Sequence, residues 1–380
     1  MAGEVVPADL LDLRHRLHRA PEVSGQEAGT AAMVLDFLAS TKPDQLLTGL
    51  GGHGLALVYD SGLAGPTVMI RAELDALPIA ETGQPDWRSG VPGKGHLCGH
   101  DGHMTILAGL AQDLAQRRPA QGRAVLLFQP AEEDGSGAAA VLADPRFDAI
   151  RPDHAFALHN LPGLPLGVAV LEPGAANCAS VGLRLRFTGR TAHAAEPDKA
   201  ISPARALANL VPALSALGPG GDLGPDFRLV TLTHMRMGEP AFGITPGAGE
   251  LWATLRCLSD ENMAELKSDA VMIARAAAEA DGLQLEVSWH DDFAASRNHP
   301  QATEVLRAAL AAEGVTRIPG LPMRASEDFG RFSSVAQSAM FWFGAGEDHP
   351  VLHAPDYDFP DSLIPPGIRV FRRAIDLILG

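Results

Sequence analysis

Continuous apolar segments alternate with helical patterns through the first 160 residues, and this alternation constrains the fold more than any other feature. Residues 66–70, 123–129 and 154–158 are apolar at nearly every position, which is typical of strands covered on both faces. Between them, residues 103–116 and 138–142 show the apolar spacing of helices. We therefore expect an α/β fold with a mainly parallel sheet flanked by helices.

The pattern changes near residue 178, where apolar and basic residues begin to alternate as in a half-exposed strand. From there the order is strand, helix, strand, strand, helix, strand, which is the order of a ferredoxin-like sandwich. These six segments are residues 181–187, 203–217, 228–235, 249–256, 260–280 and 283–290. We expect a catalytic domain formed by residues 1–177 and 291–380, with residues 178–290 inserted as an α+β lid and dimerisation domain.

Charge and cysteine content exclude several classes of protein. The chain has 380 residues, enough for two domains, and 46% of them are hydrophobic. Its formal net charge of -16 repels phosphate backbones and anionic lipids, so we expect no nucleic-acid and no membrane partner. Three cysteines do not make a disulfide framework, which favours a cytoplasmic location. The first twenty residues predict an amphipathic helix rather than a leader peptide.

The densest group of metal-ligating side chains lies in residues 96–103, HLCGHDGH, just before a predicted helix. Cys98 and His100 offer a thiolate and an imidazole, which zinc-like metals prefer, and the glycines allow a tight turn between them. Asp101 can orient a ligand imidazole by accepting a hydrogen bond from its second ring nitrogen. The alternative is a histidine-rich loop without a metal, and the density of the group argues against it.

Acidic residues and histidines follow other predicted strands. In QPAEEDG, one of Glu132 and Glu133 can bind a metal while the other acts as general base, although an acidic turn starting a helix explains them equally well. His159 and His353 also follow strands, where a lone histidine is more often structural. Asp75 is either a ligand or the partner of a ligand's second nitrogen. Jointly, four strand ends supply ligand-type side chains, which favours one metal site.

These motifs resemble those of the co-catalytic metallopeptidases and amidohydrolases that include aminoacylase and carboxypeptidase G. Within that family they are most similar to the branch of hippurate hydrolase, auxin (IAA)–amino acid hydrolase and N-acetyldiaminopimelate deacetylase. The resemblance covers nearly the whole chain, in the family's order and approximate spacing. The matching segments are RHRLH at 14–18, PE at 21–22, RAELDALPI at 71–79, CGHDGH at 98–103, QPAEE at 129–133, LH at 158–159, TAHAA at 191–195, SEDF at 326–329 and LHAP at 352–355.

The resemblance implies a phosphorylase/hydrolase-like catalytic domain with two divalent metal ions: zinc, manganese, cobalt or nickel. Glu132 matches the general base, and Asp75 matches an acid behind a ligand. His193, in the inserted domain, matches a histidine that reaches the substrate carbonyl oxygen, in some relatives from a partner subunit. The implied metal ligands are Cys98, His100, Glu133, His159 and His353, with Cys98 shared between the two ions.

The sequence departs from the family pattern at several positions. Glu73 replaces the usual Asp, and Ala20 stands where a second histidine is common. Residues 243–246, GITP, replace an Asn-Val-Ile-Pro segment whose Asn generally touches the substrate or the opposing site. Arg324, before SEDF, is either a specificity residue or, as we favour, a surface charge. These departures bear on the substrate and leave the metal ligands intact.

The function implied is that of a metal-dependent amidohydrolase, a homodimer or higher oligomer, which cleaves the amide bond of a small N-acyl amino acid or a related amide. Basic candidates for the carboxylate of the leaving amino acid, unless they are solvated charges of the sheet face, are Arg184, Arg186, Arg236 and Arg256. Three alternatives remain: a dipeptidase or carboxypeptidase on the same fold, a non-catalytic metal-binding homologue, and a cysteine hydrolase that uses Cys98. The presence of Glu132 beside a complete ligand set argues against the non-catalytic homologue.

Overall fold

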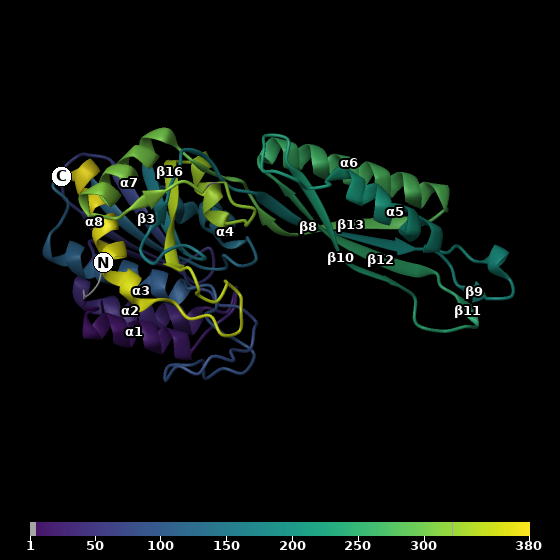
Figure 1. Ribbon diagram of the computed structural model, residues 1–380, viewed down its shortest axis with the longest axis horizontal. Helices are drawn as coiled ribbons and strands as arrows, with labels where there is room; N and C mark the ends of the chain where they lie inside the picture. The colour runs from purple at the N-terminus through teal and green to yellow at the C-terminus, as the bar shows by residue number, and fades with distance from the viewer. Residues whose placement is uncertain (1–4, 321) are drawn as a thin grey trace. The chain divides into compact units, whose positions relative to one another are not determined.

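The computed structural model describes residues 5–320 and 322–380, and its contacts divide the chain into two compact units (Figure 1). Unit 1 comprises Met1–Ala176, Arg297–Leu321 and Asp328–Gly380, and unit 2 comprises Asn177–Ser296 and Pro322–Glu327. The segment expected to be an inserted domain, residues 178–290, falls within unit 2. Among the described residues, no helix combines the length and the apolar character needed to cross a membrane.

Unit 1 contains an eight-stranded mixed sheet. Its strands are β1 Gln45–Leu50, β2 Gly54–Asp60, β3 Thr67–Glu73, β4 Arg123–Gln129, β5 His154–Pro162, β6 Ala169–Val170, β15 Arg317–Ile318 and β16 Gln337–Gly346. They follow the order β1-β2-β4-β3-β5-β16-β6-β15, and the central strands β4, β3, β5 and β16 run parallel to one another, with antiparallel neighbours β2 and β6 on either side. This arrangement confirms the predicted α/β fold with a mainly parallel sheet.

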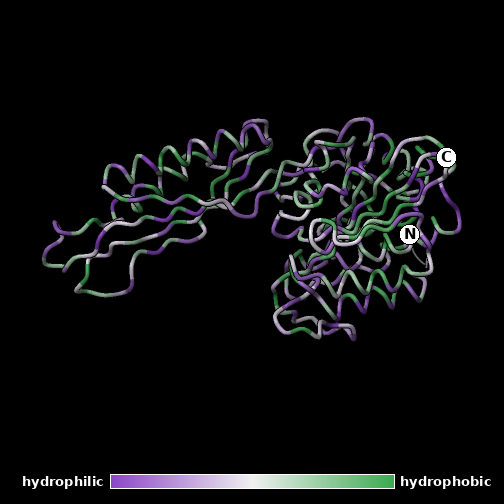
Figure 2. Tube along the Cα trace, turned by 180° about the vertical axis from the view of Figure 1, so that it is seen from behind, coloured by the Kyte–Doolittle hydropathy of each residue, from purple (hydrophilic) through white to green (hydrophobic). Residues whose placement is uncertain are grey.

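Helices cover this sheet, and their apolar sides form the main core of unit 1. They are α1 Ala8–Arg19, α2 Ala28–Leu38, α3 His100–Gln116, α4 Gly137–Ala143, α7 Pro300–Ala312 and α8 Ile364–Leu379. One continuous cluster of buried side chains joins α1, α2, α3, α7 and α8 to the sheet strands, which appear as hydrophobic green traces in Figure 2. Each fully buried Leu or Phe in such a core contributes about 1.5–3 kcal/mol.

The position of α3 depends on its close contact with α8. Gly109 of α3 faces Ile368, and Gly367 of α8 faces Ile106; a Cβ atom at either glycine would overlap the opposite isoleucine. The two helices can therefore approach closely along their length. Because α3 begins at His100, this packing helps to fix the start of the helix, where the predicted metal ligands lie.

Unit 2 packs two helices against a four-stranded antiparallel sheet. Its main elements are β8 Ala179–Thr188, α5 Ala204–Leu217, β10 Arg228–Met237, β12 Ala248–Cys257, α6 Asp260–Ala280 and β13 Gln284–Phe293. The strand order β10-β12-β8-β13, with these chain connections, is that of a ferredoxin-like sandwich. The remaining strands form two separate two-stranded sheets: β7 Gly174–Asn177 with β14 Ser296–Asn298, and β9 Ala192–His193 with β11 Ile244–Thr245.

Side chains alternate between the two faces of the unit 2 sheet. Leu183, Leu185 and Phe187 of β8 are buried in the core shared with α5 and α6. Arg184 and Arg186 lie between them in sequence and are more exposed. This period of two is the pattern that the sequence predicted for a half-exposed strand.

Candidate metal centre

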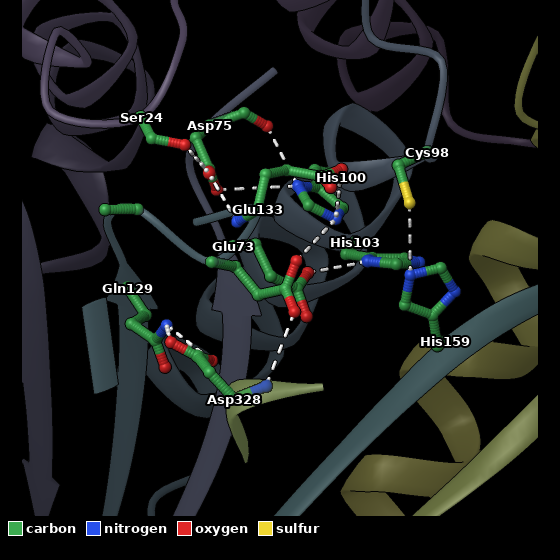
Figure 3. Close-up of polar contacts among 12 residues, drawn as sticks. Ser24, Glu73, Asp75, Cys98, His100, His103, Gln129, Glu133, His159 and Asp328 are labelled. Atoms are coloured by element: carbon green, nitrogen blue, oxygen red, sulfur yellow. Dashed lines mark hydrogen bonds and ion pairs between the residues drawn. The ribbon is translucent and has the colours of Figure 1, made fainter. Parts of the chain in front are cut away.

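Strand ends and the start of one helix supply the predicted metal ligands Cys98, His100, Glu133 and His159 (Figure 3). Glu132 and Glu133 follow β4, His159 lies near the carboxyl end of β5, and Cys98 and His100 precede and begin α3. Because β4, β3 and β5 are parallel, their carboxyl ends meet at one edge of the sheet. The fold therefore places ligand groups from distant segments together.

Two groups of ligand atoms share Cys98. The ligand atoms of Cys98, His100 and His159 lie within 4.8 Å of one another, and so do those of Cys98, Glu133 and His353. All five predicted ligands are thus brought together, with Cys98 common to both groups. The backbone N–H of His353 donates to Leu97 O at 2.8 Å, which ties the last ligand to the segment that carries Cys98.

The two buried imidazoles are both held through Nδ1. His100 Nδ1–H donates to the backbone carbonyl of Asp75 at 2.8 Å, and His159 Nδ1–H donates to the carbonyl of Asn160 at 2.8 Å. The Nε2 atom of each ring therefore faces the cluster. His159 Nε2 lies 3.4 Å from Cys98 Sγ, and His100 Nε2 lies 3.9 Å and 3.8 Å from carboxylate oxygens of Glu132 and Glu133. A divalent cation among these atoms would balance the carboxylate charge and take the place of a proton on His100 Nε2.

The pKa shifts of His100 and Cys98 show an excess of negative charge around these two side chains. Burial alone would lower the pKa of His100, but Asp75, Glu73 and Glu133 raise it to about 10. Burial and the charges of Glu133 and Glu132 raise the pKa of the Cys98 thiol well above its usual value. Without a cation, Cys98 is therefore a poor nucleophile, which argues against the cysteine hydrolase alternative. The donor set of thiol, imidazole and carboxylate fits divalent metal ions.

Asp75 organises two ligands at once. Its carboxylate accepts hydrogen bonds from Ser24 Oγ at 2.7 Å and from the Glu133 backbone N–H at 2.9 Å. Its backbone carbonyl, rather than its carboxylate, is the closer partner of His100, since Asp75 Oδ1 lies 3.6 Å from His100 Nδ1. Of the two roles predicted for Asp75, the geometry fits the partner of a ligand's second nitrogen.

Asn160 connects the ligand segments, and the sequence alone did not single it out. Its side chain lies 2.6 Å from His103 Nε2 and donates to Tyr357 Oη at 2.5 Å. It also fills the space beside Gly99, between Cys98 and His100, where φ is +94° and a Cβ atom would overlap Asn160. The signal available in the sequence was its position next to His159 at a strand end.

Glu73 lies close to His100, with ligand atoms within 4.8 Å of each other, but its polar contacts are made with Arg71 and His103. It forms an ion pair with Arg71, and its other oxygen lies 2.6 Å from His103 Nδ1. Arg71 also pairs with Asp328 at 2.5 Å, and Gln129 donates to the same Asp328 carboxylate at 2.8 Å. All of these side chains are buried. The departure from the family's Asp is thus accommodated in a charge network beneath the site.

Asp101 does not orient a ligand imidazole, which is the role considered for it. It accepts a hydrogen bond from His18 Nδ1 at 2.8 Å and pairs with Arg14 at 3.1 Å, both on α1. The physical reason is its place in the first turn of α3, where its side chain faces α1. The RHRLH motif of α1 therefore anchors the start of α3.

An aromatic side chain borders the cluster. Trp342 of β16 pairs in register with His159 of β5, and their ring centroids are 5.1 Å apart. Trp342 is only 2% exposed. The imidazole of His159 therefore lies against an apolar wall that restricts its orientation.

The remaining predicted site residues lie in unit 2. His193 is exposed on β9, and its Nδ1 accepts the Ala195 N–H at 3.0 Å. The GITP segment that departs from the family pattern supplies β11, in which Ile244 pairs directly with His193. Arg324 donates to Gly221 O at 2.5 Å and is exposed, as expected of a surface charge. The catalytic role of His193 stays a prediction.

The four arginines considered for substrate binding have partners within unit 2. Arg184 and Arg236 both pair with Glu250, at 2.7 Å, and Arg186 pairs with Glu286 at 3.3 Å. The fourth, Arg256, donates to Ser326 Oγ at 2.9 Å. These contacts favour the interpretation of sheet-face charges.

A parallel sheet whose strand ends bring thiol, imidazole and carboxylate groups to adjoining centres defines a metal-dependent hydrolase of the α/β class. Comparison with known families makes the assignment specific. The chain belongs to Peptidase family M20/M25/M40, whose model matches residues 69–377.

Curated relatives match over almost the full chain. An N-acetyldiaminopimelate deacetylase of Listeria monocytogenes serotype 4a (strain HCC23) is 30% identical over 350 residues, covering 91% of this chain and 93% of the relative. An N-acetyl-L-cysteine deacetylase of Bacillus subtilis (strain 168) is 29% identical over 361 residues, covering 93% and 84%.

Solved structures share the fold. A Bacillus subtilis protein described as a dinuclear metal binding peptidase from M20 family has a TM-score of 0.82 at 24% identity, with 97% of each chain covered. An aminobenzoyl-glutamate utilization protein from Klebsiella pneumoniae has a TM-score of 0.76 at 23% identity, with 96% of this chain and 95% of that chain covered.

Proposed function

We propose that the protein is a metal-dependent amidohydrolase that releases an amino acid from a small N-acyl amino acid. The family and the deacetylases among the relatives support the reaction class. The observation that carries the proposal is the pair of ligand groups sharing Cys98, in which Nε2 of His100 faces the Glu132 and Glu133 carboxylates and Nε2 of His159 faces the Cys98 sulfur. Two divalent ions are held, in this proposal, by Cys98, His100, Glu133, His159 and His353.

The proposed mechanism gives Glu132 the central proton transfers. Divalent ions held by these five ligands would supply an acidified water and polarise the amide carbonyl. Glu132 lies 3.9 Å from His100 Nε2 and is 5% exposed, so its carboxylate adjoins the ligand cluster without being in the bulk solvent. Glu132 accepts the proton of the attacking water and then passes it to the nitrogen of the departing amine. Asp75 keeps His100 and Glu133 in place during the reaction.

Unit 2 is proposed to act as a lid and as the dimer interface. Strand β10 lies at the edge of its sheet, and several large apolar side chains near that edge are exposed: Met235, Met237, Phe242 and Ile244. Edges with exposed apolar side chains are suited to pairing with a second copy. His193, from this unit or its copy in the partner subunit, would help to stabilise charge on the substrate carbonyl oxygen.

The test combines metal analysis with a substrate panel. Metal content and hydrolysis of N-acetyl amino acids, N-benzoyl amino acids and dipeptides are measured before chelation, after chelation and after addition of single divalent metals. We expect chelation to abolish release of the amino acid and one added metal to restore it.

Each other outcome points elsewhere. Turnover that is indifferent to metal contradicts the mechanism. Preference for dipeptides moves the protein to the dipeptidase alternative. Bound metal without turnover of any substrate supports the non-catalytic alternative.

A further inference from the structure

The loop that carries Glu132 and Glu133 contains a residue in an unfavourable backbone conformation. Ala131, which follows Pro130 at the end of β4, has φ +50°, in the left-handed region that residues with a Cβ atom rarely adopt. A backbone hydrogen bond across the turn stabilises it, since the Gly137 N–H donates to Ala131 O at 2.8 Å. A contact must hold Ala131 at positive φ, because a change to a more favourable φ would reorient the side chains of Glu132 and Glu133.

A buried carboxylate on a distant segment makes the contact that can do so. Glu27 Oε1 accepts the Ala131 N–H at 2.9 Å and the Gly25 N–H at 2.8 Å, and Glu27 is 0% exposed. Glu27 is the residue that precedes α2, yet its side chain does not cap that helix. Its carboxylate is therefore directed to the loop after β4 instead of to its own helix.

Two carboxylates together fix alternate N–H groups of this loop. Glu27 takes the N–H of Ala131, and Asp75 takes the N–H of Glu133 at 2.9 Å. Ser24, three residues before Glu27, in turn donates to the Asp75 carboxylate at 2.7 Å. Residues 24–27 therefore support both carboxylates, because Glu27 is one of them and Ser24 donates to the other, Asp75. Glu132 lies between Ala131 and Glu133, whose N–H groups these two carboxylates accept.

We propose that Glu27 is a positioning residue that holds Ala131 in its left-handed conformation and so directs Glu132 and Glu133 toward the metal centre. The inference rests on the function proposed above and adds a residue to which neither the motifs nor the comparisons assign a role. Among the described residues, Glu27 Oε1 accepts from the backbone of Ala131 and Gly25 and from no predicted metal ligand, so its influence on the two glutamates passes through the backbone of Ala131.

Five variants of the full chain separate this role from simple packing. Glu27→Ala leaves the Ala131 N–H without its acceptor, so we expect Mn²⁺ affinity, measured by calorimetry on the chelator-treated protein, to fall by about tenfold or more. We expect kcat to fall with it, while KM changes less. The amide oxygen of Glu27→Gln can still accept from the Ala131 N–H, so this variant should stay near wild type.

The decisive variant adds Ala131→Gly to Glu27→Ala. Glycine adopts positive φ without a steric penalty, so the double variant should recover a measurable part, about threefold or more, of the lost Mn²⁺ affinity. Ala131→Gly alone should change affinity little, because Glu27 is still present. A cavity left by Glu27→Ala would not be relieved by removing a methyl group elsewhere, so recovery distinguishes positioning from packing.

Glu22→Ala is the matched control. Glu22 lies on the same segment and accepts the Thr30 N–H at 2.7 Å and the Thr30 hydroxyl at 3.0 Å, without contacting Ala131. We expect this variant to shift the melting temperature and to leave Mn²⁺ affinity within about twofold of wild type.

The inference is overturned if Glu27→Ala leaves both Mn²⁺ affinity and kcat unchanged, or if Ala131→Gly restores nothing. It is distinguishable from the proposed function because Mn²⁺ affinity does not depend on knowing the substrate. Shifts in affinity without turnover of any N-acyl amino acid would refute the proposed function and keep the inference. Turnover of N-acyl amino acids that Glu27→Ala leaves unchanged would keep the proposed function and refute the inference.

Discussion

Networks of fully buried charged side chains distinguish unit 1 from unit 2. In unit 1, Arg14, Arg71, Glu73 and Asp101 are at most 1% exposed and are joined in networks with other buried groups. In unit 2, most ion pairs, such as that of Arg186 with Glu286, lie on exposed surfaces. Burying charges is costly unless each finds partners, so proteins keep such networks where geometry matters. The contrast indicates that the chemistry is organised in unit 1.

The largest expected effect is the loss of kcat on replacing the proposed general base, Glu132 of unit 1. Glu132→Gln keeps the shape of the side chain but removes proton acceptance, so kcat should fall roughly a thousandfold while metal content stays unchanged. Steady-state kinetics with parallel metal analysis measures both. Glu265→Gln, at an exposed position on α6 of unit 2, serves as the control and should leave kcat near wild type. Normal turnover by Glu132→Gln would show that the base is assigned wrongly.

A comparison of two arginines tests the buried network itself. Arg71→Met leaves Glu73 and Asp328 without their shared cation, so the free energy of unfolding should fall by about 3–5 kcal/mol. Arg186→Met, which removes an exposed pair of unit 2, should cost less than about 1 kcal/mol. Denaturant unfolding of both variants measures the difference. Equal losses would break the distinction between the units.

The smallest predicted effect is a pH dependence of stability. Burial alone would lower the pKa of His18, but hydrogen bonds with Asp101 and Glu81 raise it from 6.5 to about 9. Because the folded value lies above the unfolded one, the stabilisation is complete below about pH 6.5 and is lost as pH rises through about 9. It amounts to about 3 kcal/mol at most.

The measurement is the free energy of unfolding at several pH values between 6 and 10, for wild type and for His18→Gln. The variant should show a flatter profile over the window of about pH 6.5 to 9. A control, His290→Gln on the exposed strand β13 of unit 2, should keep the wild-type slope. Parallel profiles for wild type and His18→Gln would contradict the assigned network.

Elements with strong apolar patterns were predictable from the sequence. The predicted strand at 123–129 and the predicted helix at 260–280 coincide with β4 and α6. The antiparallel pair β1–β2 and the helix α8 were not predicted. The burial pattern of β1 is largely exposed, and α8 begins with Ile364-Pro365-Pro366-Gly367, residues that usually mark a break. Pro365 and Pro366 are tolerated because they occupy the first turn, where no intrahelical N–H partner is needed.

The site was predictable where residue type alone indicates chemistry, as for Cys98 and His100. Supporting residues such as Asn160 and Glu27 were not, because their importance lies in contacts with segments more than 50 positions away. The same limit applied to Asp101, for which local sequence suggested a ligand imidazole whereas the fold supplies His18 of α1. Partners chosen by tertiary packing leave no local pattern.

The contact between Trp342 and His159 gives the proposed metal centre an optical reporter. The chain has four tryptophans, and two of them, Trp252 and Trp289, lie in unit 2. Trp342 has its indole against a predicted metal ligand, whereas Trp87 stacks on His15 at 3.8 Å. Indole emission depends on its immediate surroundings, so the fluorescence of Trp342 should respond when a metal binds to His159, and the tryptophans of unit 2 supply a constant background.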